Sequence, residues 1–164
     1  MMALQNDYFS VTASIALPFF LKYFDDQSLN EQQRNFLFEL KKWDYNTGPD
    51  SRATTIYQAW MDSLESIVWS DEFARVPYVK ERPDEQMLLE ALLKDSAFRY
   101  IDNINTSDTE TLQQQVTAAF INASEGLAEE QETNNLLWWK HKNPSILHLL
   151  RNSVLPFGRS GIMA

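Results

Sequence analysis

Residues 53–68 read ATTIYQAWMDSLESIV, and this stretch decides the fold class. Its apolar side chains recur at spacings of three, four and seven residues, which places them on one face of an α-helix. The stripe consists of Ala53, Ile56, Tyr57, Trp60, Met61, Leu64, Ile67 and Val68. Such a stripe is typical of a helix packed on a hydrophobic core, so we interpret it as core rather than as a ligand-binding face. Asp50 or Ser51 is expected to cap the start of this helix.

Helical patterns also precede this stretch. Residues 4–25 predict a helix that is apolar on most sides, and Pro18 should kink or divide it because proline removes a backbone donor. Residues 28–31 read SLNE and predict a capping box in which Ser28 and Glu31 start a second helix. That helix should end near Trp43, before a turn at residues 46–50.

Further helices are expected after residue 80. Pro83 suits the first position of a helix, with acidic residues favourable in the first turn. Residues 107–110 read SDTE and predict a second capping box that opens a longer helix. A short last helix should begin at Asn143–Pro144 and continue through Leu150. With no confident strand and only four glycines, the sequence predicts one all-α domain of about six helices over residues 1–164.

Composition narrows the function classes. There are 14 basic against 23 acidic residues, a net charge of −9 that would repel a phosphate backbone or an anionic membrane. The absence of cysteine excludes disulfides, thiolate zinc sites and cysteine nucleophiles. No apolar run reaches the ~20 residues of a bilayer span, and residues 1–10 lack the pattern of a signal peptide. We therefore expect a soluble protein that binds neither nucleic acid nor membrane.

Few side chains suggest chemistry. His141 and His148 lie seven residues apart with Pro144 between them and no carboxylate one turn away, so a metal site there is the weakest hypothesis. A small metalloenzyme on these two residues would need stoichiometric zinc or iron. Trp138 and Trp139 could stack on a planar ligand, but paired aromatics are more typical of a core or an interface.

A run of glutamates lies near the end of the fifth predicted helix. The run consists of Glu129, Glu130 and Glu132. General acid–base work needs carboxylates that converge across a cleft in differing environments, whereas adjacent glutamates on one helix diverge. We interpret the run as a solvated face.

Three motifs follow one another along the whole chain. The first lies at residues 4–13 and contains Leu4-Gln5-x-Asp7-x-x-Ser10-x-x-Ala13. The second is Leu37-x-x-Leu40-x-x-Trp43-Asp44, followed by Ser51-x-Ala53-Thr54-x-Ile56-Tyr57-x-x-Trp60. The third is Ile146-x-His148-Leu149, followed by Phe157 and Gly161. In order and spacing, the chain resembles the penicillin acylase family of N-terminal-nucleophile amide hydrolases. It departs from the family at residues 138–141, WWKH, where the family often has a glycine after tryptophan.

The resemblance implies a parent enzyme whose catalytic serine becomes the first residue of a chain after self-cleavage. The free α-amine of that serine then acts as general base within an αββα sandwich. In the family, the nucleophile and the oxyanion residues lie upstream of the matched stretch, and a glycine pair would follow Ala164. We therefore expect no catalytic, cofactor-binding or metal-binding residue and no cofactor in this chain.

The resemblance also sets the expected partners. The chain should be an inert helical piece of the nucleophile-bearing subunit, in the periplasm or cell envelope, that packs on the rest of the parent hydrolase. Its exposed apolar surface, which could support a homodimer, is expected at Tyr8, Phe9, Phe19 and Phe20. The alternative is a free-standing, non-catalytic interaction module, with a partner surface around Trp138 and Trp139.

Overall fold

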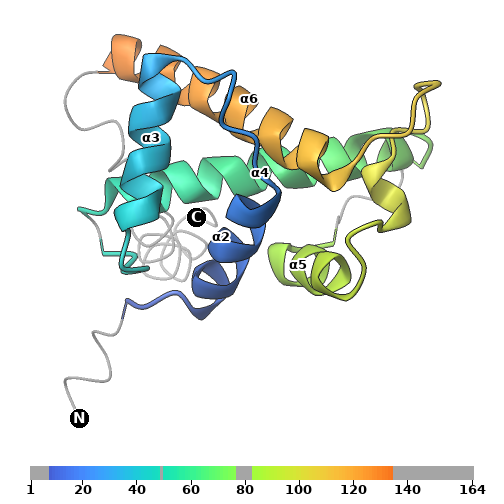
Figure 1. Ribbon diagram of the computed structural model, residues 1–164, viewed down its shortest axis with the longest axis horizontal. Helices are drawn as coiled ribbons and strands as arrows, with labels where there is room; N and C mark the ends of the chain where they lie inside the picture. Colours follow the sequence, from blue (N-terminus) through green and yellow to red (C-terminus); the bar gives the residue numbers. More distant parts are fainter. Residues whose placement is uncertain (1–7, 49, 77–82, 135–164) are drawn as a thin grey trace, which may run out of the picture.

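The computed structural model describes residues 8–48, 50–76 and 83–134. These residues form five α-helices and one short 3₁₀-helix, with no strand among them, so the all-α prediction is confirmed (Figure 1). The elements are α2 (Val11–Tyr23), α3 (Glu31–Lys42), α4 (Arg52–Ala74), α5 (Glu85–Lys94), η1 (Arg99–Ile101) and α6 (Leu112–Asn134). About six helices were expected, and the last of them, at residues 143–150, lies outside the described residues.

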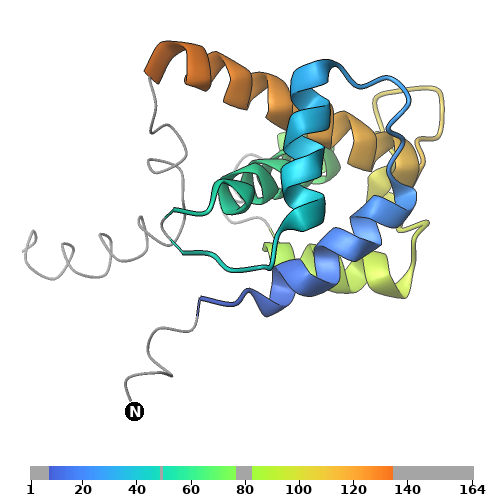
Figure 2. The ribbon, with the colours of Figure 1, turned by 60° about the vertical axis from the view of Figure 1, so that its left-hand side comes forward.

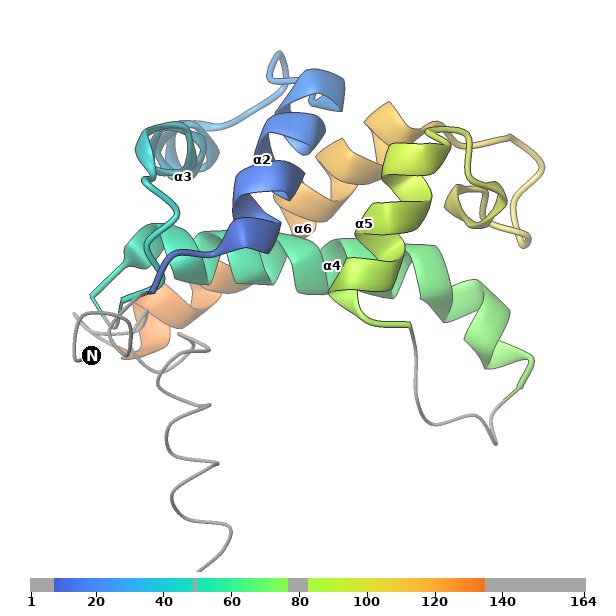
Figure 3. The ribbon, with the colours of Figure 1, turned by 90° about the horizontal axis from the view of Figure 1, so that it is seen from below.

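Helix α4 is the centre of the arrangement. It packs most extensively on α6, the other 23-residue helix, while α2, α3 and α5 lie on one side of α4 (Figure 3). Helix α3 contacts both α4 and α6 and crosses them, whereas α2 contacts α6 and α5 (Figure 2). None of the described helices is both long and apolar enough to cross a membrane.

Trp60 of α4 lies at the middle of the core. Its side chain has no exposed surface, and three phenylalanine rings lie with their centroids 5.0–5.7 Å from its own: Phe20, Phe24 and Phe120. The indole Nε1 donates to the carbonyl oxygen of Val116 on α6 at 2.9 Å. The stripe predicted at residues 53–68 is confirmed as core, since its members are buried apart from the half-buried Ile67.

The N-terminus of α4 was predicted correctly, and the second helix needs a correction. Ser51 caps α4 by accepting from the backbone N–H of Thr54 at 3.3 Å. Helix α3 is capped by Asn30 rather than Ser28, and Asn30 and Gln33 each accept the other's backbone N–H at 2.9 Å. The helix starts two residues later than predicted because Leu29 is buried in the core just before it.

The starts of α5 and α6 are also shifted relative to the prediction. Asp84 caps α5 by accepting from the N–H of Met87, so Pro83 lies before the cap instead of inside the helix. Helix α6 begins after Thr111, which exchanges hydrogen bonds with Gln114. Glu110, the glutamate of the capping box predicted at residues 107–110, does not cap the helix, because its carboxylate accepts hydrogen bonds from the Asn103 N–H and the Thr106 hydroxyl in the preceding loop.

The first helix is shorter than predicted and continuous. It begins at Val11 with Ser10 as its cap, and residues before it are extended: Phe9 forms an antiparallel bridge with Asn46. Pro18 lies inside the helix without dividing it. Because Pro18 is exposed, the backbone carbonyl four residues earlier, which loses its donor, can be solvated.

Candidate functional site

The second sequence motif folds into a loop that is tied to the start of α4. The indole Nε1 of Trp43 donates to the carbonyl oxygen of Asn46 at 2.9 Å, and the Thr54 hydroxyl donates to the same oxygen at 3.3 Å. The Asp44 carboxylate accepts from the N–H of Asn46 at 3.0 Å. Tyr45 lies between them with a φ of 63°, a left-handed conformation that these surrounding hydrogen bonds and ring contacts hold in place.

The same loop holds the segment that contains the first motif. The N–H of Ser10 donates to Tyr45 O at 2.9 Å, and the N–H and hydroxyl of Thr47 both donate to Tyr8 O at 2.8 Å. The ring of Phe9 meets that of Tyr45 edge-on, with centroids 6.0 Å apart. The first two motifs are therefore neighbours in space, and their polar groups bind one another rather than pointing into a cleft.

A tyrosine–carboxylate pair joins α4 to α5. The hydroxyl of Tyr57 donates to Oε1 of Glu85 at 2.5 Å, and the Trp43 ring packs against Tyr57 with centroids 5.5 Å apart. Burial raises the pKa of Tyr57 far above its usual range, and the charge of Glu85 adds to this shift. Burial also raises the pKa of Glu85, and Asp62 and Asp84 add to the rise while the hydrogen bond from Tyr57 opposes it.

A carboxyl group with a raised pKa is the kind of group that general acid–base catalysis uses. Catalysis would also need a nucleophile and a cavity where a substrate could meet both. Neither Tyr57 nor Glu85 lines either of two large cavities on the described residues, the groove along α5 and the cavity beside η1. The pair therefore acts as a link between two helices. Sequence reasoning missed it, because the partners are 28 residues apart and Tyr57 was assigned to the apolar stripe of α4.

The larger of the two cavities is an open groove along α5. It has a volume of about 720 Å³ and is lined by Met87, Glu90, Lys94 and Phe98, among others. A second cavity of about 590 Å³ lies where the end of α2, the residues around η1 and the start of α6 meet. The lining of the second cavity includes the hydroxyl residues Ser96, Thr109 and Thr111 together with the carboxylates of Asp102 and Glu110.

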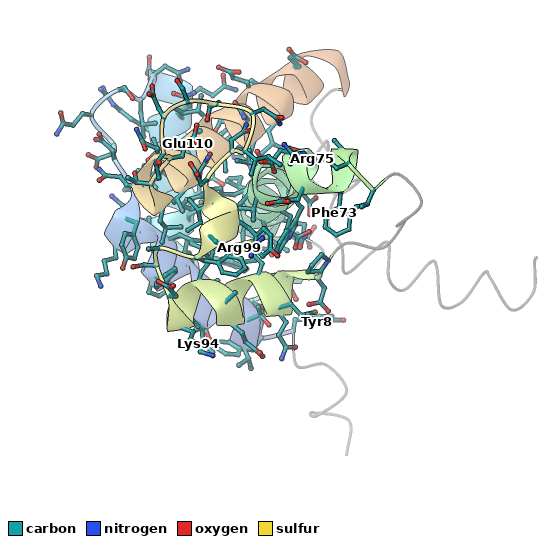
Figure 4. All side chains as sticks on the ribbon, turned by 90° about the vertical axis from the view of Figure 1, so that its right-hand side faces the viewer. Tyr8, Phe73, Arg75, Lys94, Arg99 and Glu110 are labelled. Atoms are coloured by element: carbon teal, nitrogen blue, oxygen red, sulfur yellow. The ribbon has the colours of Figure 1, made fainter. Side chains whose placement is uncertain are left out.

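The cavity of about 590 Å³ contains charged groups from two elements. Arg99 and Glu110 both line it, and they lie on the same side of the molecule, above Lys94 in the view of Figure 4. Glu110 accepts from the N–H of Asn103 and from the hydroxyl of Thr106, each at 2.8 Å. The N–H of Asn103 is the main cause that lowers the pKa of Glu110, so this carboxylate stays ionised and braces its own loop.

The residues singled out from the sequence are distributed as follows. Glu129 is exposed on α6, which agrees with the interpretation as a solvated face, while the side chains of Glu130 and Glu132 are not described. The four residues with the most open roles, Trp138, Trp139, His141 and His148, lie outside the described residues. Within the described part of the chain, no group of three or more side chains could hold a metal ion.

The expected apolar surface needs one correction. Tyr8 and Phe9 are exposed as predicted, and Phe19 is half-buried, but Phe20 has no exposed surface. Phe20 packs on Trp60 instead, with centroids 5.7 Å apart. Helix α2 is apolar on most sides, so its sequence did not distinguish the face that turns inward.

The described residues thus define an all-α domain whose polar side chains connect loops and helix starts to one another. A family model described as penicillin amidase matches residues 1–162. The chain belongs to the penicillin amidase family. Comparisons with curated proteins and with solved structures returned no significant match.

Proposed function

We propose that this chain is the helical domain of a penicillin-acylase-like hydrolase that cleaves the carbon–nitrogen bond of a linear amide. The observation that carries the proposal is the family match over residues 1–162. The substrate would be a penicillin side chain or another N-acyl amine, and the enzyme would work in the periplasm or cell envelope. The chain itself supplies architecture, and the reaction uses residues from other parts of the parent protein.

In the parent, acyl transfer would take place on an N-terminal serine. The α-amine of that serine would take the hydroxyl proton as the oxygen attacks the amide carbon, and backbone donors would stabilise the tetrahedral oxyanion. Such chemistry requires groups held to within fractions of an ångström. We assign to the loop at residues 43–51 the task of holding the motif segments rigid beside the catalytic domain.

The exposed apolar surface supports an interaction with the rest of the parent. Several large apolar side chains are about half-exposed or more on the described residues: Phe9, Val11, Ile15, Phe38, Met87 and Leu93. Such residues are expected where a domain packs on a neighbour, and in isolation they could join two copies. A free-standing interaction module would use the same surface for a separate partner. The two readings differ in whether the reading frame continues into a hydrolase on both sides.

Two assays test the proposal. The chain alone, mixed with a chromogenic phenylacetyl amide, should give no turnover and no acylation by a serine-directed reagent. Turnover or acylation of this chain would refute the architectural role. Sequencing the gene on both sides should find an in-frame Gly–Ser junction upstream and a Gly–Gly pair after Ala164, and a stop codon without an upstream frame would favour the free-standing module.

A variant of the parent enzyme separates architecture from chemistry. Trp43→Phe removes the hydrogen bond to Asn46 O but leaves the ring in place, so it should reduce the yield of processed enzyme. The kcat/KM of the enzyme that does form should stay unchanged. Ser66→Ala, at an exposed site on α4 outside this loop and outside the exposed apolar surface, serves as the control and should reduce neither quantity. A fall in kcat/KM with normal yield for Trp43→Phe would instead place this loop at the substrate.

A further inference from the structure

The cavity beside η1 is a site that the proposed function does not use. Its volume of about 590 Å³ lies within the range of small-molecule sites. Its apolar lining comes from three elements: Tyr23 ends α2, Phe98 precedes η1, and Leu112 begins α6. Leu112 is buried, whereas the two aromatic rings are half-buried. A ligand with an apolar body would remove the exposed part of these rings from water.

The two carboxylates that line this cavity are bound to their own loop. Both oxygens of Glu110 already accept hydrogen bonds, one from the N–H of Asn103 and one from the hydroxyl of Thr106. Oδ1 of Asp102 accepts from the N–H of Glu110 at 3.2 Å. The carboxylates therefore hold the loop at residues 102–110 together, and a cationic ligand would have to compete with these bonds.

The cationic group of the cavity, by contrast, has no carboxylate partner. Arg99 is exposed, and its guanidinium lies over the ring of Tyr100, 4.5 Å from the ring centroid. Next to the cavity, Nζ of Lys22 lies 5.1 Å from the centroid of the Tyr23 ring. Neither cation forms an ion pair within the described part of the chain, although the sequence has 23 acidic against 14 basic residues. Two unpaired cations in so acidic a protein indicate a place for an anionic ligand.

We propose that this cavity binds an amphipathic monocarboxylate, with its carboxylate on the Arg99 guanidinium and its apolar body against Tyr23 and Phe98. The planar guanidinium suits a carboxylate because it can donate two parallel hydrogen bonds to it. The hydroxyl of Ser96 also lines the cavity and can donate a further hydrogen bond. None of these residues belongs to the three sequence motifs, so the inference does not depend on the proposed hydrolase function.

Titration of the full chain with octanoate, followed by nuclear magnetic resonance of the backbone amides, tests the proposal. The amides of Tyr23, Phe98 and Leu112 should shift and reach saturation, whereas those of Val11 and Ile15, exposed apolar residues outside the cavity, should not. Octanol and octylammonium have the same alkyl chain without a carboxylate, and both should bind at least about tenfold more weakly. Equal affinity for the three compounds, or shifts spread over all the exposed apolar residues, would overturn the proposal.

Variants of Arg99 test the role of the guanidinium. Arg99→Gln removes the charge at an exposed position and should weaken octanoate binding at least about tenfold. Arg99→Lys keeps the charge without the planar fork and should recover part of the affinity. Arg34→Gln removes an exposed arginine of α3 that does not line the cavity, so it is the matched control and should leave the affinity unchanged. Equal losses in Arg99→Gln and Arg34→Gln would refute this site.

A further variant blocks the cavity without a change of charge. Ala97 is exposed and lines the cavity, so Ala97→Trp places a large ring there and should abolish the octanoate-induced shifts. Ala74→Trp, at an exposed position of α4 outside the lining, is its control and should leave the shifts unchanged. Unchanged affinity in Ala97→Trp would overturn the proposal. If octylammonium binds more tightly than octanoate, and Arg99→Gln strengthens its binding, the cavity recognises cations and the proposal also fails.

Discussion

Replacing Trp60 by phenylalanine should lower the free energy of unfolding by about 3 kcal/mol. The indole Nε1 loses its hydrogen bond to Val116 O, 2.9 Å long and buried, which is worth about 1 kcal/mol. The side chain has no exposed surface, so the lost ring atoms forfeit about 1 kcal/mol of burial. The gap left among Phe20, Phe24 and Phe120 adds about 1 kcal/mol, because close-packed rings relax only in part.

Urea denaturation followed by far-ultraviolet circular dichroism measures this loss. With a slope of about 2–3 kcal/mol/M, the midpoint should fall by about 1–1.5 M. Trp43→Phe is the matched control, because the Trp43 Nε1 donates to a carbonyl in a partly exposed loop and its loss should cost less. A loss below about 1 kcal/mol for Trp60→Phe, or a larger loss for Trp43→Phe, would refute the view that Trp60 is the centre of the core.

Three further predictions concern single polar side chains. Ser51→Ala removes the cap of α4 and should cost about 1 kcal/mol, measured by thermal unfolding against the exposed Ser66→Ala. The Glu85→Gln variant should become more stable relative to the unaltered chain as pH rises. The pKa of Glu85 is raised in the folded state, so the stabilisation that Glu85 contributes is present below pH 4.5 and is lost as pH rises through the folded-state pKa. Urea midpoints of both proteins between pH 4 and pH 8 check this, and a constant difference would contradict it. Tyr57→Phe should raise the pKa of Glu85 further, because it removes the hydrogen bond that opposes the shift. Carboxyl titration followed by nuclear magnetic resonance measures this pKa, and an unchanged or lowered value would contradict the prediction.

Periodicity predicted the helices well where one face is clearly apolar. The stripe from Ala53 to Val68 turned inward as expected, and α3 ended at Lys42, next to the predicted Trp43. In both cases the pattern is local, and burial follows from it directly. Helix α2 shows the limit of this reasoning, since nearly every side of it is apolar and its inward face depends on the neighbours it meets.

The helix starts were less predictable because several polar residues compete for each cap. Ser28 and Asn30 can both accept a backbone N–H, and the burial of Leu29 decides between them. Likewise, the carboxylate of Glu110 is used by its own loop and is not available to a helix. The link between Tyr57 and Glu85 depends on how α5 packs against α4, which no short-range pattern contains.

The bridge between residues 8–10 and residues 45–47 determines how the domain would respond to mechanical load. Three hydrogen bonds join the two segments, from Ser10 N–H and from both donors of Thr47. A pulling force applied to the chain before Tyr8 would load these bonds together before it reached the first turn of α2. The helix would therefore be shielded from tension until the loop yielded, and single-molecule stretching from that end should show an early, separate rupture ahead of the unfolding of the core.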